Sequence, residues 1–274
     1  MIAKKQAVRE TGAGSKNISR TPRIHLTCAN AKSKCEITMH QSWPRSARAI
    51  PCGVSESPFK PHFFEREDES PDALFYAQAR LLVHIDEHAI AAAGALYGEL
   101  LPPRAALLDL MSSYRSHLPD ALAWSRLAGL GMNETELREN PQLTEYAVRD
   151  LNADPRLPYG DAEFDGAVVT VSVQYMTKPV EIFREVCRVL QPGAPLVVTY
   201  SNRMFPTKAV RVWRALDDRE RAGLIGAYFK HAGGFGEVTM QDRSVDSDGD
   251  PLYAVWARKA LVDGGPVAAP VDGM

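Results

Sequence analysis

The stretch Ala105–Pro119, AALLDLMSSYRSHLP, decides the fold class of this 274-residue chain. Its apolar run ends at Asp109, and the small residues Ser112 and Ser113 follow. Because the run does not alternate between apolar and polar residues, it predicts a parallel strand that is buried on both faces. Open α/β sheets bind ligands at the carboxyl ends of their strands, where the strand order reverses. The stretch therefore predicts a ligand site at the end of the first strand of an α/β sheet.

Downstream of this stretch, strand patterns alternate with helix patterns, and such alternation predicts a parallel sheet with helices on both faces. The predicted fold is a Rossmann-like, doubly wound α/β sheet, mostly parallel, with an antiparallel C-terminal hairpin. The predicted strands cover Ala105–Leu108, Trp124–Met132, Tyr146–Leu151, Gly166–Val173, Leu196–Tyr200, Gly236–Arg243 and Leu252–Arg258, and the predicted helices cover Leu118–Ala123, Glu134–Glu139, Pro179–Leu190, Lys208–Leu216 and Asp218–His231.

Upstream of the first strand, the pattern predicts one or two leading helices over residues 70–100. Ser70-Pro71-Asp72 is typical of a helix start, with a capping hydroxyl, proline at the first helical position and an acid in the first turn. An apolar stripe continues to about Leu100, and two prolines then release the chain into the strand. We therefore expect one domain over residues 58–260, with these helices at its beginning.

The two ends of the chain differ from this domain in composition. Residues 1–55 hold ten Lys and Arg against two acids, about +8, whereas the whole chain has a net charge of −2. Residues 1–57 lack an apolar period, which predicts a disordered basic tail. Two alternatives stay open, a start codon assigned upstream of a true start near Met39, and an organellar transit segment. Residues 261–274, rich in Gly, Pro and Ala, also predict a disordered tail.

Charge and residue chemistry exclude several functions. The domain is acidic, which argues against nucleic acid as a partner, and the sequence has no run of 18 apolar residues that would span a membrane. Three of the four cysteines lie in the basic tail in no zinc-binding pattern, so a reducing, cytoplasmic location is the simplest expectation, or an organelle if the tail is a transit segment. His84 and His88 have the spacing of two metal ligands on one helix face, but no third ligand is evident, and no metal is predicted.

A more specific signal lies in residues 157–202. Leu157-Pro158-Tyr159 and Phe164-Asp165 precede the predicted strand 166–173, and Arg188-Val189-Leu190-Gln191-Pro192-Gly193 precedes the next one. This pattern resembles the class I S-adenosylmethionine-dependent methyltransferases of the type-11 group, over about residues 74–259. Residues 111–119 and 202–210 also resemble two segments of a narrower subgroup within this family. The resemblance implies S-adenosylmethionine as the cofactor and methyl transfer as the activity. The acidic domain, which has no basic aromatic groove, favours a small-molecule or lipid-like acceptor.

The resemblance also implies which residues contact the cofactor, in three motifs. The first, usually an acid followed by a glycine-rich loop, corresponds to Asp109, Met111, Ser112 and Ser113, and here the glycines are missing. The second, an acid for the ribose hydroxyls, corresponds to Gly131, Met132 and Asn133, and here the carboxylate is missing. The third, which reads adenine, corresponds to Asp150, Leu151 and Asn152, and Val171 and Ser172 complete the cleft floor.

Acceptor-binding residues are expected over the ends of the strands. The candidates are His117, Tyr175, Asn202, Arg203 and, from the leading helices acting as a lid, Tyr76 or His84. No residue is assigned a catalytic role, because the fold alone does not define one. The altered cofactor motifs leave a second hypothesis open, a methyltransferase-fold binding or scaffold protein without catalysis. Either a monomer or a homodimer is compatible with the sequence.

Overall fold

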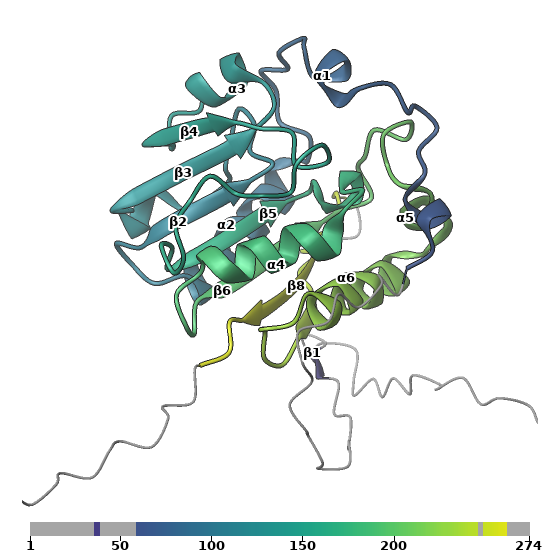
Figure 1. The fold of residues 1–274 in the computed structure, drawn as a ribbon. Coiled ribbons are helices and arrows are strands. Elements are labelled where there is room, and N and C mark those ends of the chain that lie inside the picture. The colour runs from purple at the N-terminus through teal and green to yellow at the C-terminus, as the bar shows by residue number, and fades with distance from the viewer. Residues whose placement is uncertain (1–35, 39–58, 246–248, 262–274) are drawn as a thin grey trace, which may run out of the picture.

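The computed structural model describes residues 36–38, 59–245 and 249–261 of the chain. Its centre is an eight-stranded sheet with strand order β1-β7-β8-β6-β5-β2-β3-β4 (Figure 1). The strands are β1 (Glu36–Thr38), β2 (Ala106–Leu110), β3 (Arg126–Gly131), β4 (Glu145–Val148), β5 (Gly166–Thr170), β6 (Pro195–Tyr200), β7 (Thr239–Asp242) and β8 (Tyr253–Arg258).

The sheet confirms the predicted fold class. Strands β4, β3, β2, β5 and β6 are parallel, and β8, β7 and β1 continue the sheet in antiparallel pairs. The strand order reverses at β2, which pairs with β3 on one side and with β5 on the other. The carboxyl ends of β2 and β5 therefore form the topological switch point at which ligands bind in such sheets.

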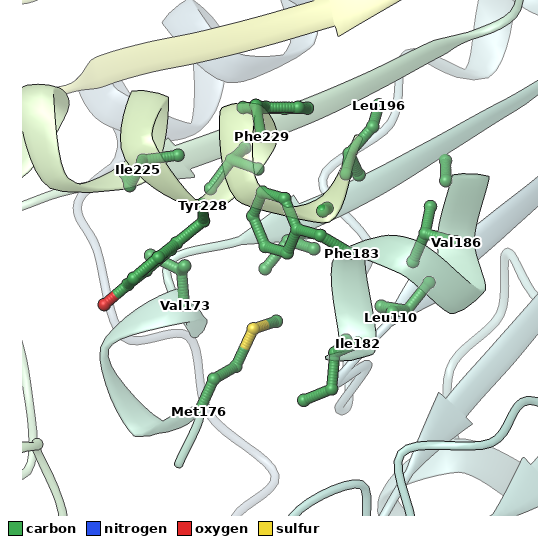
Figure 2. Packing of buried hydrophobic residues seen from close by; sticks show 14 of the residues in the cluster. Leu110, Val173, Met176, Ile182, Phe183, Val186, Leu196, Ile225, Tyr228 and Phe229 are labelled. Atoms are coloured by element: carbon green, nitrogen blue, oxygen red, sulfur yellow. The ribbon is translucent and has the colours of Figure 1, made fainter. Parts of the chain in front are cut away.

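Helices cover both faces of the sheet. The α-helices are α1 (Asp72–Phe75), α2 (Glu87–Leu100), α3 (Glu134–Arg138), α4 (Pro179–Val189), α5 (Arg211–Ala215) and α6 (Asp218–Ala232), and the 3-10 helices are η1 (Pro61–Phe64), η2 (Asp120–Leu122) and η3 (Val173–Tyr175). Helices α4 and α6 lie in front of the sheet in Figure 1 and share a core cluster with its strands. Figure 2 shows Phe183 of α4 packed between Tyr228 and Phe229 of α6. Helix α2 packs in the cluster on the opposite face.

The leading segment is less helical than predicted. Only Asp72–Phe75 and Glu87–Leu100 are helical between residues 70 and 100, and Leu74, Leu81 and Leu82 are 70%, 49% and 53% exposed. Ser70 does not cap α1, because Pro71 occupies the N-cap position and the Ser70 carbonyl accepts a hydrogen bond from Lys208 Nζ (2.7 Å). Leu81 and Leu82, which the pattern placed on a helix face, therefore lie in the loop between α1 and α2.

The chain ends also differ from the prediction where they are described. Residues 36–38 form β1 on the outer side of β7, so three residues of the predicted disordered tail pair with the sheet, and the terminal hairpin does not form its edge. The remainder of residues 1–57, including the possible start near Met39, and residues 262–274 lie outside the described residues. Strands β7 and β8 form the predicted antiparallel pair. No helix in the described ranges is long and apolar enough to cross a bilayer.

Several element boundaries shift, and one shift concerns the site. The first strand continues through Asp109 to Leu110, so Asp109 lies within β2 and not after it. The strand predicted to reach Val173 ends at Thr170, because Val171 has a positive φ of 42°. Helix α5 begins at Arg211, and Lys208 precedes it in a buried, non-helical position.

Candidate active site

A cavity of about 400 Å³ lies at the carboxyl ends of β2, β3, β4 and β5. This volume is in the range of small-molecule sites, and its position is the switch point of the sheet. The loops after the four strands form its floor, and residues 72–84 with residues 203–205 form its roof. Fourteen of the residues predicted from the sequence line it: Tyr76, Met111, Ser112, Ser113, Gly131, Met132, Asn133, Asp150, Leu151, Asn152, Val171, Ser172, Tyr175 and Arg203.

Three predicted residues lie outside the cavity lining. Asp109 is 2% exposed and accepts a hydrogen bond from Ser112 Oγ (2.6 Å), and burial raises the pKa of its carboxyl to about 7. His117 lies in the loop between β2 and η2, and burial, with smaller contributions from His84 and Arg115, lowers its pKa to about 4. Asn202 is exposed. Asp109 therefore supports the loop from within β2, since its carboxylate has turned away from the ligand space.

The loop after β2 lies close to β3 without containing glycine. Met111 has a positive φ of 54°, and the Ser112 N–H donates to the Leu130 carbonyl (2.9 Å). A Cβ added to Gly131 would lie 2.2 Å from the Ser112 carbonyl oxygen. The glycine that permits close backbone approach is therefore at the end of β3, and the same contact leaves no room for an acidic side chain at position 131.

Asn133 does not replace the missing ribose-binding carboxylate, because its amide is engaged with the protein. Its Oδ1 accepts from the Glu136 N–H (3.1 Å), which confirms Asn133 as the N-cap of α3. Its Nδ2 donates to the carbonyls of Tyr76 (2.8 Å) and Ala77 (3.2 Å). Asn133 therefore attaches the roof of the cavity to the end of β3.

The segment after β4 keeps free hydrogen-bonding groups. Asp150 Oδ1 accepts from the N–H groups of Asn152 (2.9 Å) and Ala153 (3.1 Å). In the described part of the chain, Asp150 Oδ2 and the Leu151 N–H have no hydrogen-bond partner. The Asn152 amide, in contrast, is fully used, since it binds Asp72, the Tyr175 carbonyl and the Thr177 N–H. Asp150 and Leu151 thus present an acceptor next to a donor.

On the opposite side, the ends of β5 and β6 contribute a second set of polar groups. The Ser172 hydroxyl is buried in the cavity wall and has no partner in the described residues. The Tyr175 hydroxyl accepts from the Phe205 N–H (2.8 Å), and burial raises the pKa of this phenol. Arg203 Nε binds Asp250 Oδ1 (2.8 Å). Tyr175 therefore holds the 203–205 segment over the cavity, and Ser172 Oγ is a group that a ligand would satisfy.

A buried charge network fastens the roof. Lys208 is fully buried, and its Nζ contacts Asp68 Oδ2 (3.2 Å) and Asp72 Oδ1 (3.2 Å). Arg66 Nη1 binds the same Asp72 oxygen at 2.6 Å. Each charge thus has an opposite partner, which a buried ion requires. The network determines where the chain enters the roof at residues 66–72.

Sequence reasoning missed several residues of the lining, among them the charged residues Glu136 and Arg80. The Glu136 carboxylate accepts from Ser113 Oγ (2.6 Å) and from the Arg80 backbone N–H (2.7 Å). The N-cap pattern that begins at Asn133 could have placed Glu136 beside the end of β3. No pattern in the sequence signals Arg80, because its loop position depends on distant contacts. His84 also lines the cavity, and within the described ranges no three His, Cys, Asp or Glu side chains gather to hold a metal ion.

Comparisons with known proteins indicate which proteins the chain resembles. Residues 116–198 match the family model described as "Methyltransferase domain". The methyltransferase phqN of Penicillium fellutanum is 34% identical over 76 residues, and the match spans 26% of this chain and 23% of that protein. The predicted resemblance to class I, type-11 S-adenosylmethionine-dependent methyltransferases is confirmed.

Solved structures with the same type of fold share little sequence with the chain. A possible histamine N-methyltransferase from Thermotoga maritima is 16% identical, with a TM-score of 0.46 over 63% of this chain and 90% of that one. An S-adenosylmethionine-dependent methyltransferase from Aquifex aeolicus gives the same identity and TM-score over 63% and 92%. The [4+2]-cyclase SpnF is also 16% identical, with a TM-score of 0.46 over 62% and 81%.

Proposed function

We propose that the chain is an S-adenosylmethionine-dependent methyltransferase that acts on a small, partly apolar acceptor. The observation that carries the proposal is the cavity at the switch point, where Asp150 Oδ2, the Leu151 N–H and the Ser172 hydroxyl stand without protein partners. Such groups are satisfied by a bound ligand or by water. The match of residues 116–198 to a methyltransferase domain supports S-adenosylmethionine as that ligand.

The residues present fit this cofactor in part of the cavity. Asp150 and Leu151 pair a free acceptor with a free donor, as the edge of an adenine ring requires. The close approach of Ser112 to Gly131 leaves the floor lined by backbone, so a ligand can lie flat against it. When bound, S-adenosylmethionine would supply an activated methyl group, which passes to a nucleophilic atom of the acceptor while S-adenosylhomocysteine is the leaving group. The chain contributes mainly position and orientation to such a transfer.

The acceptor is proposed to lie between the roof and Tyr175. Leu82 and Val83 line this part of the cavity while 53% and 44% exposed, so they offer apolar contact to a small-molecule or lipid-like acceptor. If the acceptor loses a proton, His84 is the residue placed to accept it. Burial, opposed by Glu136, lowers the pKa of His84, so the imidazole is neutral at pH 7. Tyr175 stays protonated and acts as a hydrogen-bonding group.

The test is thermal unfolding of the full chain with and without S-adenosylhomocysteine. At one hundred times its dissociation constant the ligand should stabilise the fold by about 2.7 kcal/mol, a shift of several degrees. Asp150→Ala should abolish most of the shift. Asp154→Ala is the matched control, since Asp154 is exposed and lies outside the cavity lining. No shift of the unaltered protein at millimolar ligand would contradict the proposal and favour the non-catalytic alternative.

A further inference from the structure

Arg80 has a fixed position in the cavity wall. Its guanidinium carbon lies 4.6 Å from the centre of the Phe75 ring and 5.2 Å from that of Phe205. Its Nη2 donates to the Phe75 carbonyl (3.0 Å), and its backbone N–H donates to Glu136 Oε1 (2.7 Å). Contacts with two aromatic rings and two hydrogen bonds hold the residue in one place, which preorganises the guanidinium for a ligand.

The charge of Arg80 is not neutralised by the protein. Its Nη1 is buried and has no hydrogen-bond partner, and the guanidinium forms no ion pair within the described residues. Asp72, Glu136 and Asp150 line the same cavity, but within the described residues none of them forms an ion pair with Arg80. Both Glu136 oxygens accept other hydrogen bonds, and Asp72 binds Arg66 and Lys208. A partly buried guanidinium without an anion is rare in proteins, because desolvation of its charge is unfavourable.

Neutral and basic groups also line this cavity. His84 is neutral, since burial lowers its pKa, and Arg149 and Arg203 line the same cavity. A guanidinium presents paired N–H donors in a plane, the arrangement that matches the two oxygens of a carboxylate.

We propose that Arg80 is the anion-binding residue of the cavity and that its ligand is a carboxylate. The carboxylate has two possible sources, the amino-acid portion of the cofactor and the acceptor itself. Only the assignment between these sources rests on the proposed function. The presence of a carboxylate site at Arg80 is independent of methyl transfer.

The first experiment measures dissociation constants by calorimetry for Arg80→Met, Arg80→Lys and the unaltered protein. Two probes are compared, S-adenosylhomocysteine, which carries a carboxylate, and 5′-methylthioadenosine, which lacks the amino-acid portion. If the cofactor supplies the carboxylate, Arg80→Met should raise the dissociation constant of S-adenosylhomocysteine at least tenfold. The dissociation constant of 5′-methylthioadenosine should stay unchanged. For Arg80→Lys, the dissociation constant of S-adenosylhomocysteine should lie between those of Arg80→Met and the unaltered protein, since lysine keeps the charge and loses the paired donors. Arg138→Met is the control, because Arg138 is exposed on α3 and pairs with Glu139.

The second experiment tests the acceptor as the source. Acetate, phenylacetate and octanoate are compared with their neutral amides as stabilisers in thermal unfolding, with and without saturating 5′-methylthioadenosine. If the acceptor supplies the carboxylate, an acid should stabilise the protein more than its amide does. This difference should be lost in Arg80→Met and kept in Arg138→Met. If Arg80→Met changes neither the dissociation constant of S-adenosylhomocysteine nor the extra stabilisation by the acids, the inference is wrong, even if S-adenosylhomocysteine binds to the protein. If the unaltered protein ignores both nucleosides but prefers the acids through Arg80, the inference holds and the proposed function fails.

Discussion

Asp86 and Asp250 each accept a hydrogen bond from the other's backbone. The Asp86 N–H donates to Asp250 Oδ2 (3.0 Å), and the Asp250 N–H donates to Asp86 Oδ2 (2.6 Å). Asp86 Oδ1 also caps α2 through the Ala89 N–H, and Asp250 Oδ1 binds Arg203. This reciprocal contact connects the β7–β8 loop to the start of α2 and to the edge of the cavity. Asp250 thus serves as a long-range attachment of the β7–β8 connection, of which residues 246–248 lie outside the described part.

Asp250→Ala should destabilise the fold more than removal of its charged partner does. It deletes the acceptor of the Asp86 N–H as well as the ion pair, at an expected loss of about 1–2 kcal/mol of unfolding free energy. Arg203→Met should cost about 0–1 kcal/mol, because the Arg203 side chain is 62% exposed. Urea denaturation of both variants measures the difference. Equal losses would mean that the reciprocal contact adds no stability beyond the ion pair.

Asp109 should make the unfolding free energy fall as the pH rises. Burial raises the pKa of its carboxyl to about 7 from the ordinary 3.8, so the folded protein holds a proton that the unfolded chain releases. Between about pH 4 and pH 7 the free energy of unfolding therefore decreases progressively, by on the order of 4 kcal/mol at most. Asp109→Asn should remove this dependence. The gain in melting temperature of Asp109→Asn over the unaltered chain should therefore be larger at pH 8 than at pH 5. Asp154→Asn is the exposed control, and parallel pH profiles for all three proteins would contradict the assignment.

Gly131→Ala should disturb the loop after β2, since the new methyl group would lie 2.2 Å from the Ser112 carbonyl oxygen. We expect a loss of about 1–3 kcal/mol from overpacking, together with weaker S-adenosylhomocysteine binding as the floor shifts. Gly223→Ala is the matched control in α6, where nothing lies within 4 Å of the added Cβ. That change should stabilise the helix by about 0.5–1 kcal/mol. Denaturation and calorimetry measure both effects, and an unchanged Gly131→Ala protein would show that the loop yields freely.

Lys208→Met should be among the most destabilising single changes. Lys208 is fully buried, and without it Asp68 and Asp72 lose a positive partner, at an expected cost of about 3–5 kcal/mol. Arg211→Met removes an ion pair with Glu65 in which both side chains are more than half exposed, and it should cost about 0–1 kcal/mol. A loss below 1 kcal/mol for Lys208→Met in chemical denaturation would show that Arg66 alone compensates Asp72.

Local sequence determined the elements that depend on neighbouring residues alone. The β-branched run at Gly166–Thr170 forms β5, and the apolar stripe after Pro179 forms α4 as predicted. Asn133 caps α3, as its position before an acidic turn indicated. The alternation of these elements was sufficient for the doubly wound sheet, because right-handed crossovers leave few arrangements. Fourteen of the predicted site residues line the cavity, since parallel strands bring their carboxyl ends to one edge.

Tertiary structure alone decided which side chains face the ligand space. Asp109 lies within β2 and is buried there. The contacts of Lys208 hold residues 68–72, which lead into the roof, although the sequence pattern had predicted a helix from residue 70 onward. Arg80 and Glu136 are joined in the site by a hydrogen bond between residues that lie 56 positions apart in the sequence. The orientation of a side chain depends on the free energy of its contacts with distant segments, whereas local patterns contain only the preferences of neighbouring residues. The sequence therefore determined where a site forms, and long-range packing of charged and aromatic groups determined its chemistry.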